Sequence, residues 1–428
     1  MRFKTSLFLI ALLFCNATFC FAQLNNAKKI IHTLSSPDFH GRGYVSKGDK
    51  IAAKFIQKEF KKLDLKKFNK SYLQEFSFSI NTQPKELLLA LNKEKLIPGK
   101  EYLIDPASPS IKGTFETLST NCNELLHTDQ FLNKLRNSAN KILLIDCYNL
   151  ASFDRKQKNK INELINFLRY SKEHPAKAVI VFNTEKLTWH GSTIQAPKAS
   201  FTVSKKVNLE TIKTIKLDCK SKFKEKYTSN NCIGYIEGST EKDSIIAITA
   251  HYDHLGRMGK STYFPGANDN ASGIALLLEI ANYFSQHPPK YTLVFLAFGG
   301  EEIGLLGSKY FTENPLFPLK NIKFLWNFDL AGTGSEGLKI VNGSVYEKEF
   351  EKLLAINTKE NLLPGIYKRG KACNSDHCYF DQLGVKTFYS YTLGGIKAYH
   401  DIYDKPETLP LTEFLDYKKI MCRFIEQL

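Results

Sequence analysis

Acidic side chains and a histidine follow three apolar segments of the 428-residue sequence, at points where they could bind a metal ion. The residues concerned are His251, Glu301, Glu302 and Asp329. Each preceding segment has the apolar character of a buried β-strand. Because ligands bind outside the carboxyl ends of the strands in a doubly wound sheet, we expect these side chains to meet at one sheet edge.

Carboxylates gathered at one place repel one another unless a positive charge compensates them. Divalent metal ions supply that charge, and a mixture of imidazole and carboxylate ligands favours zinc. A two-metal site holds its ions ~3.5–4 Å apart, bridged by one carboxylate. Asp253 lies two residues after His251. On an extended chain it faces the same side and is well placed to orient the imidazole.

The adjacent residues Glu301 and Glu302 indicate two separate roles. One carboxylate can hold metal while its neighbour, which faces elsewhere, takes a proton from a water molecule that the metal has made more acidic. The same carboxylate can then pass that proton to a leaving amine. These residues therefore predict hydrolysis of an amide bond.

The elements that would position these residues alternate between strands and helices from about residue 211 onward. Strands are predicted at 233–236, 244–250, 291–298, 322–328 and 385–391, and helices at 272–284, 303–310 and 411–427. The spacing of apolar residues also predicts helices within 27–64. We expect an α/β fold in which a mostly parallel mixed sheet is sandwiched by helices.

The middle of the sequence indicates a smaller inserted α/β domain. Strands predicted at 141–146 and 178–182 flank a predicted helix at 158–170. The predicted divisions of the chain are residues 1–22 as a signal peptide, 23–88 as the first part of the main domain, 89–212 as the insertion and 213–428 as the rest of the main domain.

The first 22 residues predict export. Arg2 and Lys4 precede an apolar run from Leu7 to Phe21, and Ala22 is followed by a polar segment. This pattern is typical of a signal peptide that is cleaved after Ala22. The run is shorter than the ~20 apolar residues of a membrane span. We expect a periplasmic or secreted protein with no stable membrane insertion.

Charge and cysteine content set further bounds. The net charge is +16, but the lysines are spread along the chain. No nucleic-acid motif is present, so we expect no nucleic-acid partner. Outside residues 1–22, the cysteines closest in sequence are Cys219 with Cys232 and Cys373 with Cys378. The sequence leaves their pairing and the oligomeric state open.

Four motifs, in their order and spacing, resemble the zinc exopeptidase family of bacterial leucyl aminopeptidases and glutamate carboxypeptidase II. They are HYDHLG at 251–256, GANDNASG at 266–273, GEEIGLLGS at 300–308 and NFD at 327–329. SDH at 375–377 and the late pair Tyr399-His400 also match. The resemblance covers about residues 213–428 and, more loosely, 27–80. It implies the family's zinc exopeptidase phosphorylase/hydrolase-like fold.

The resemblance implies a set of zinc ligands. They are His251, Asp269, Glu302, Asp329 and His400. In the family's usual arrangement His251 and Asp329 bind one zinc, Glu302 and His400 bind the other, and Asp269 bridges the two. Asp269 and His400 are assigned as ligands by the resemblance alone, because their positions in the sequence do not by themselves predict that they lie at the site.

The resemblance also implies roles beside the ligands. Glu301 is similar to the family's general base, acting on a metal-bridging water, and Asp253 to the group that orients His251. The sequence departs from the family after the late histidine, because Asp401 and Lys405 stand where threonines are common. We expect His254 to be structural or solvent-facing and His190 to be a surface or loop histidine.

The inserted segment resembles a protease-associated domain, a lid-like module of some family members. The motifs that match are KILLID at 141–146, AKAVIVFN at 176–183 and PKASFTV at 197–203. The function implied for the whole chain is removal of N-terminal residues from peptide substrates by an enzyme with two zinc ions.

Three other functions remain open. A carboxypeptidase of the glutamate carboxypeptidase type would use the same residues. A glutaminyl cyclase shares the fold and uses one zinc, but cyclases tend to lose the NASG and GLLGS contexts that this chain keeps at 270–273 and 304–308. An inactive binding scaffold is the third, and the presence of every implied ligand and of Glu301 argues against it.

Overall fold

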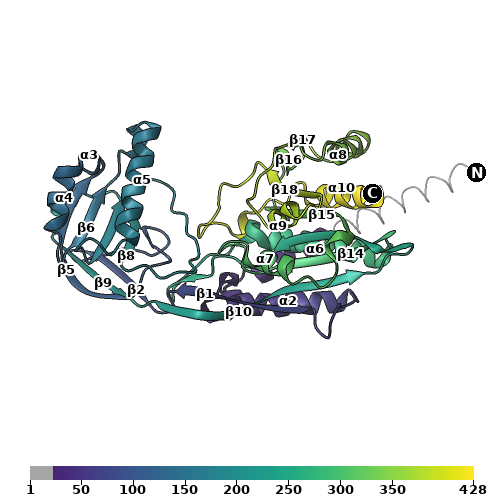
Figure 1. The fold of residues 1–428 in the computed structure, drawn as a ribbon, viewed down its shortest axis with the longest axis horizontal. Coiled ribbons are helices and arrows are strands. Elements are labelled where there is room, and N and C mark those ends of the chain that lie inside the picture. Colours follow the sequence, from purple (N-terminus) through teal and green to yellow (C-terminus); the bar gives the residue numbers. More distant parts are fainter. Residues whose placement is uncertain (1–22) are drawn as a thin grey trace, which may run out of the picture.

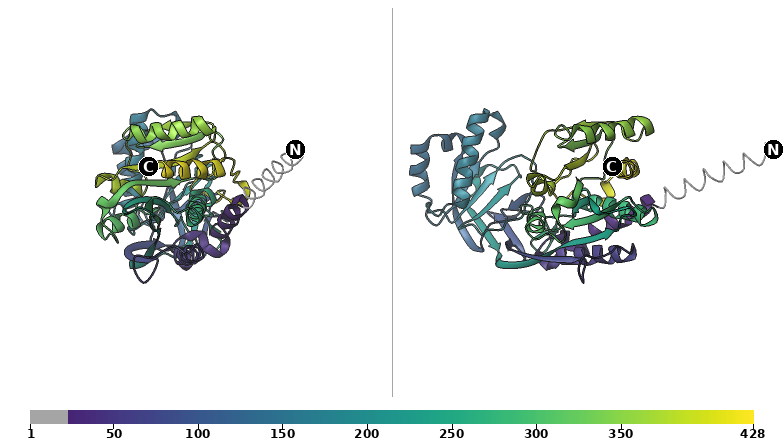
Figure 2. Two further views of the ribbon diagram at one scale, coloured as in Figure 1. Left: turned by 90° about the vertical axis from the view of Figure 1, so that its right-hand side faces the viewer. Right: turned by 45° about the vertical axis from the view of Figure 1, so that its right-hand side comes forward.

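The computed structural model describes residues 23–428, so the predicted signal peptide lies outside the described residues. The described chain contains two eight-stranded sheets. Figures 1 and 2 show them at the two ends of an elongated molecule, joined by long strands. We call them the main sheet and the insertion sheet.

The main sheet has the strand order β1-β10-β14-β11-β15-β18-β16-β17. Its strands are β1 (Leu73–Thr82), β10 (Lys222–Ile236), β11 (Glu241–His251), β14 (Tyr291–Phe298), β15 (Ile322–Asp329), β16 (Gly337–Val341), β17 (Ile366–Lys368) and β18 (Thr387–Leu393). The central strands β14, β11, β15 and β18 run parallel, and most of their residues are buried, apart from the first four of β11. Such strands are expected where helices cover both faces of a sheet. The predicted α/β class is confirmed.

Helices pack on both faces of the main sheet. They are α2 (Gly48–Lys62), α6 (Gly273–Gln286), α8 (Glu347–Glu360) and α10 (Phe414–Glu426) on one face, and α7 (Leu306–Glu313) and α9 (His377–Gln382) on the other. Successive residues of β14 point to opposite faces, so that Leu293 packs in the first core and Val294 in the second. Helix α7 begins at Leu306, later than predicted, because Gly304 and Leu305 have positive φ angles.

The insertion sheet has the strand order β3-β2-β9-β5-β6-β7-β8-β4. Its strands are β2 (Leu87–Leu91), β3 (Glu94–Lys95), β4 (Tyr102–Ile104), β5 (Ile111–Asn121), β6 (Ile142–Asp146), β7 (Ala178–Phe182), β8 (Ala199–Val203) and β9 (Thr214–Cys219). Helices α3 (Cys122–Leu126), α4 (Thr128–Arg136) and α5 (Arg155–Tyr170) cover one face. The other face packs with Leu255, Met258 and Phe264, which follow β11 in the main part of the chain. The two parts therefore share an apolar core.

The N-terminal segment belongs to the main part of the molecule. Residues 23–34 are helical, and two short 3-10 helices at Pro37–Arg42 and Val45–Lys47 lead into α2. Strand β1 then forms the edge of the main sheet through antiparallel pairing with β10. The helices predicted within 27–64 are therefore separated by a compact irregular stretch.

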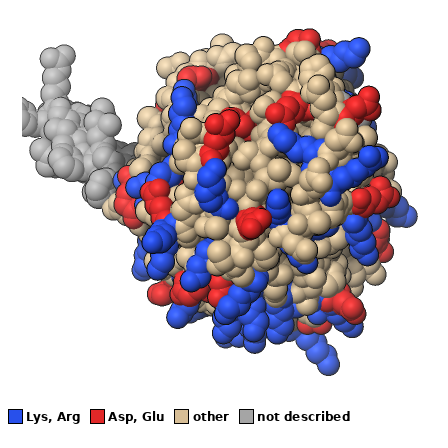
Figure 3. Space-filling view, turned by 90° about the vertical axis from the view of Figure 1, so that its left-hand side faces the viewer, with Lys and Arg blue, Asp and Glu red and all other residues tan. Residues whose placement is uncertain are grey.

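Among the described cysteines, Cys373 and Cys378 form a disulfide, and Cys219 and Cys232 are free. Cys219 lies in the insertion sheet and Cys232 in the main sheet. Within residues 23–428, no helix combines the length and apolar character needed to cross a bilayer. Figure 3 shows the end of the molecule formed by the insertion, where Lys and Arg side chains lie among Asp and Glu side chains.

Candidate metal centre

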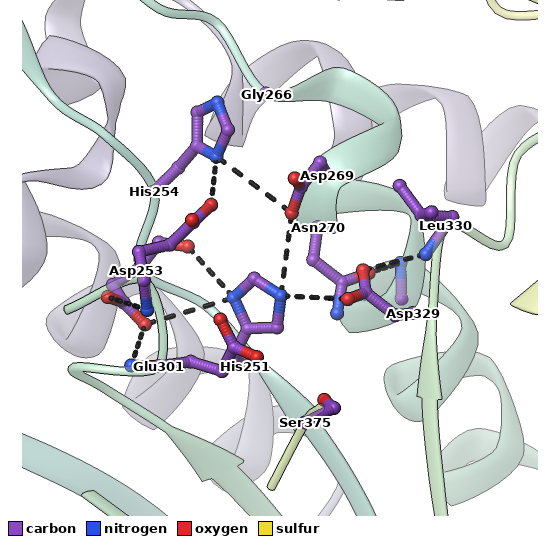
Figure 4. A network of polar contacts seen from close by, with 12 residues as sticks. His251, Asp253, His254, Gly266, Asp269, Asn270, Glu301, Asp329, Leu330 and Ser375 are labelled. Atoms are coloured by element: carbon purple, nitrogen blue, oxygen red, sulfur yellow. Dashed lines mark hydrogen bonds and ion pairs between the residues drawn. The ribbon is translucent and has the colours of Figure 1, made fainter. Parts of the chain in front are cut away.

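The carboxyl ends of three parallel strands bring charged side chains to one edge of the main sheet (Figure 4). His251 is the last residue of β11, and Asp329 is the last residue of β15. Glu301 and Glu302 lie in the turn that follows β14. Because β14, β11 and β15 are parallel neighbours, their carboxyl ends meet, as the sequence predicts.

The other two implied ligands come from loops. Asp269 lies in a distorted helical turn, Ala267–Ser272, that precedes α6. The backbone N–H groups of Asn268 and Asp269 donate to the carboxylate of Asp404 over 2.8 and 2.9 Å. His400 lies in the segment after β18. The structure thus brings all five implied ligands into one cluster.

The carboxylate of Asp269 lies between two histidines. Its Oδ1 atom is 3.5 Å from Nε2 of His251, and its Oδ2 atom is 3.2 Å from Nε2 of His400. His251 Nε2 is also 3.2 Å from Oδ2 of Asp329, and His400 Nε2 is 3.1 Å from Oε2 of Glu302. Each imidazole therefore shares Asp269 and has one further carboxylate of its own.

The donor set suits divalent cations. Potential ligand atoms of His251, Glu301 and Asp329 lie within 4.8 Å of one another, as do those of His251, Asp269 and Glu302. His251 and Asp269 are almost fully buried. Buried carboxylates require positive compensation, and nitrogen and oxygen ligands at this spacing match the preferences of zinc.

Electrostatic interactions within the cluster are strong. Burial alone would lower the pKa of His251, but the charges of Glu301 and Asp329 raise it well above its ordinary value. Burial alone would raise the pKa of Glu302, but His400 and His254 hold it well below its ordinary range. The protonated imidazoles thus compensate the negative charge of the carboxylates. A bound cation would compensate the same charge.

Glu301 differs from its neighbour. Burial raises the pKa of its carboxyl group well above the ordinary value, and the nearby charges of Asp376 and Glu302 add to this effect. His251 opposes it. A carboxyl group with a raised pKa holds a proton more readily near neutral pH, which suits a group that accepts and then releases one.

Asp253 contacts both His251 and the turn that carries the two glutamates. Nδ1 of His251 lies 3.1 Å from the backbone carbonyl oxygen of Asp253 and 3.8 Å from its carboxylate. The carboxylate accepts hydrogen bonds from the backbone N–H of Glu301 at 3.1 Å and from the hydroxyl of Tyr44 at 3.1 Å. Burial raises the pKa of Asp253 to about 7. Asp253 therefore contacts the imidazole through its carbonyl and anchors the glutamate turn through its side chain.

Two histidines that the sequence interpretation left out of the site contact its implied ligands. His254 is fully buried, and its Nδ1 atom is 2.6 Å from Oε1 of Glu302. It is therefore not solvent-facing, and it lies in the cluster itself. His190 is an exposed loop residue, as predicted, and its Nδ1 atom lies 3.2 Å from Nδ1 of His400. Only the position of His254 directly after Asp253 could have drawn attention to it.

Arg42 holds the loops around the cluster in place. Its guanidinium group is fully buried and donates to five backbone carbonyl groups, over 2.7 to 3.1 Å. The acceptors are the carbonyl oxygens of Leu34, Tyr252, Pro265, Gly266 and Asp269. Burial lowers the pKa of Arg42 to about 10, which leaves it charged at neutral pH. The arginine thus ties the N-terminal segment to the strand end and the loop that carry two implied ligands.

The SDH motif lies next to the cluster, because the side-chain amide of Asn327 in β15 donates to the hydroxyl of Ser375 over 2.8 Å. Asp376 is almost fully buried, and burial raises its pKa to about 6. The ring of His377 stacks on Tyr389 of β18 at a centroid distance of 5.0 Å. The Cys373–Cys378 disulfide brackets this motif.

A known sequence family matches the part of the chain that carries all five implied ligands. Residues 231–425 match the sequence model of Peptidase family M28. Aminopeptidase YwaD of Bacillus subtilis is 30% identical over 244 residues, which are 54% of this chain and 49% of the relative. A probable zinc metalloprotease of Pyricularia oryzae is 36% identical over 114 residues, 26% of this chain and 23% of the relative. The chain thus spans about half or less of the length of these curated relatives.

Comparison with solved structures concerns nearly the whole fold. A zinc aminopeptidase from Bacillus subtilis, BSAP, aligns with a TM-score of 0.67 at 21% identity, over 94% of each chain. An aminopeptidase from Aneurinibacillus sp. strain AM-1 aligns with a TM-score of 0.61 at 23% identity, over 94% of this chain and 93% of that one. Both alignments extend well beyond residues 231–425. The predicted family resemblance is confirmed by the match of residues 231–425 to Peptidase family M28.

Proposed function

We propose that this protein is an exported aminopeptidase that binds two zinc ions and removes N-terminal residues from peptides. The observation that supports two metal ions is the position of Asp269, whose two carboxylate oxygens point toward different histidines. A carboxylate in that position can bridge two cations. The family match and the names of the relatives support peptide hydrolysis and zinc.

In this proposal the ligands divide into two sets that share Asp269. His251 and Asp329 hold one zinc, and Glu302 and His400 hold the other. The short contacts of each histidine with its own carboxylate support this division. Bound zinc would supply Lewis-acid polarisation of the substrate carbonyl and would lower the pKa of water.

Glu301 serves as general base in the proposed reaction. Its carboxylate takes a proton from the attacking water and delivers it to the nitrogen of the leaving amine. The raised pKa of Glu301 supports this role, because its carboxylate binds a proton more strongly than an exposed glutamate does and can carry it from the water to the amine. Asp253 fixes the backbone from which Glu301 projects.

The proposal extends to the rest of the chain. Residues 1–22 are a signal peptide that directs export to the periplasm or the exterior. The predicted insertion, residues 89–212, is protease-associated-like and lies beside the peptidase part, and the insertion sheet extends beyond these predicted bounds, from Leu87 in β2 to Cys219 in β9. The apolar core that the insertion sheet shares with Phe264 supports a fixed position for this module.

The purified protein is expected to hold about two zinc equivalents per chain, because the cluster provides two ligand sets. Elemental analysis of protein dialysed against zinc, and of an Asp269→Ala variant, measures this. The variant should lose zinc from both sites, since both ligand sets include Asp269. Two tightly bound equivalents in Asp269→Ala, or fewer than two in the unaltered protein, would contradict the bridged arrangement.

Incubation with a peptide library should release free amino acids one at a time from the N-terminus. The experiment compares peptides with free and acetylated N-termini and follows the products by mass spectrometry. An aminopeptidase must recognise the free amine, so the acetylated set should remain intact. Release from the C-terminus would replace the proposal with a carboxypeptidase, and N-terminal pyroglutamate would replace it with a cyclase.

A further inference from the structure

A loop of the insertion reaches the candidate metal centre. This loop, residues 183–198, connects β7 to β8. It is fastened to the main part of the molecule at several points. The backbone N–H of Asn81 donates to Ser192 over 2.8 Å, and Trp189 stacks on Phe264 at a centroid distance of 4.9 Å. The loop is therefore held against the main part of the molecule, although it connects two strands of the insertion sheet.

Two adjacent residues of this loop contact His400 in different ways. The backbone N–H of Trp189 donates to the carbonyl oxygen of His400 over 2.9 Å. Nδ1 of His190 lies 3.2 Å from Nδ1 of His400. The loop thus contacts both the backbone and the imidazole of one implied zinc ligand.

The segment around His400 needs support. His400 has a φ angle of 52°, in the left-handed region that residues other than glycine seldom adopt. Lys186, also in the loop, forms an ion pair with Asp401 at 2.8 Å and donates to the carbonyl oxygen of Tyr399 at 3.0 Å. Asp401 stands where the family commonly has threonine. In this chain, a residue that is unusual for the family thus forms an ion pair with Lys186 of the insertion. The loop therefore contacts three consecutive residues, 399–401.

The chemistry of imidazole indicates which of the two rings donates the hydrogen bond and which accepts it. Nε2 of His400 faces the carboxylates of Asp269 and Glu302, so it is the nitrogen that would bind a cation. A neutral imidazole that binds through Nε2 carries its proton on Nδ1 and donates it to an acceptor. Nδ1 of His190 is the atom in position to accept it.

We propose that His190 is a positioning residue that holds His400 in its metal-binding tautomer and orientation, so that the insertion completes the metal centre. This inference rests on the proposed role of His400 as a zinc ligand. Partners of this kind, which accept the second N–H of a ligating histidine, typically contribute 10- to 100-fold in metal affinity. In this chain the partner comes from a different part of the fold.

The test compares three variants of the full protein: His190→Phe, His190→Asn and His127→Phe. Phenylalanine removes the acceptor but keeps a ring. Asparagine keeps an acceptor, because its side-chain oxygen can occupy the place of Nδ1. His127 is an exposed histidine of the same insertion, between α3 and α4, and serves as the matched control.

The two zinc affinities are measured by competition with a chromophoric chelator, and thermal unfolding of the zinc-free proteins monitors folding. His190→Phe should weaken one zinc site by about 10- to 100-fold and leave the other close to its original affinity. His190→Asn and His127→Phe should resemble the unaltered protein. Unchanged affinities in His190→Phe, or equal weakening of both sites, would overturn the proposal. Failure of the unaltered protein to bind two zinc ions would instead refute the proposed function.

Discussion

Glu301→Gln is expected to reduce kcat for peptide hydrolysis by about 10²- to 10⁴-fold while zinc binding persists. Glutamine has nearly the same shape but cannot accept a proton at neutral pH. The side chain of Glu301 lies in the cluster with His251 and Asp329, where a proton acceptor can reach a water molecule at the site. Steady-state kinetics on an aminoacyl anilide and elemental analysis measure the two quantities.

A matched variant separates this effect from a general one. Glu313→Gln makes the same change at an exposed position at the end of α7 and should keep full activity. If Glu301→Gln retains turnover comparable to Glu313→Gln, Glu301 is not the base. If Glu301→Gln loses zinc, Glu301 is a metal ligand, as its place beside His251 and Asp329 would then indicate.

Arg42→Met is expected to reduce the free energy of unfolding by about 3–5 kcal/mol. The substitution leaves five backbone carbonyl groups without a charged donor in a buried place. It also removes a positive charge whose surroundings include Asp253, Asp269 and Asp404. Urea unfolding with zinc removed by a chelator isolates this effect from that of the metal.

The control for Arg42→Met is Arg136→Met, at an exposed position at the end of α4, which should unfold like the original protein. Arg42→Lys should also be destabilised, because an ammonium group cannot reach acceptors arranged around a planar guanidinium. Equal urea midpoints for Arg42→Met and Arg136→Met would show that the loops hold their shape without the arginine.

The strand ends of the main sheet could be predicted because local signals determine them. Apolar runs identify β11, β14 and β15, and the rule that ligands lie at the carboxyl ends of parallel strands brings His251 and Asp329 together. Asp269 and His400 could be assigned only through the family resemblance. Their loops are positioned by distant contacts, such as those of Asp404 with the backbone of Asp269.

The contributions of other residues depend on contacts that no local pattern reveals. Arg42 and its acceptors Pro265 and Gly266 are far apart in the sequence. His190 and His400 lie in parts of the chain that meet only when the insertion docks. A histidine in a polar loop has the same appearance in sequence whether it faces solvent or a metal ligand, so these roles required the structure.

Element boundaries differ from prediction where side chains cap or bend the backbone. Helix α5 begins at Arg155, three residues before its predicted start, because Asp154 and Gln157 form a reciprocal capping box. Its first turn contains lysines and no apolar residue, so hydrophobic periodicity does not detect it.

The two ends of the insertion leave the main sheet side by side. Thr82 at the end of β1 pairs with Lys222 at the start of β10, and Leu87 at the start of β2 pairs with Cys219 at the end of β9. The whole insertion therefore occupies the place of a hairpin turn. Once it has folded, its ends are already adjacent, and the entropic cost of joining β1 to β10 is that of closing a short loop. The pairing of β1 with β10, which are far apart in the sequence, then resembles that of two strands joined by a short turn. This reduces the kinetic cost that long-range strand pairing otherwise imposes on folding.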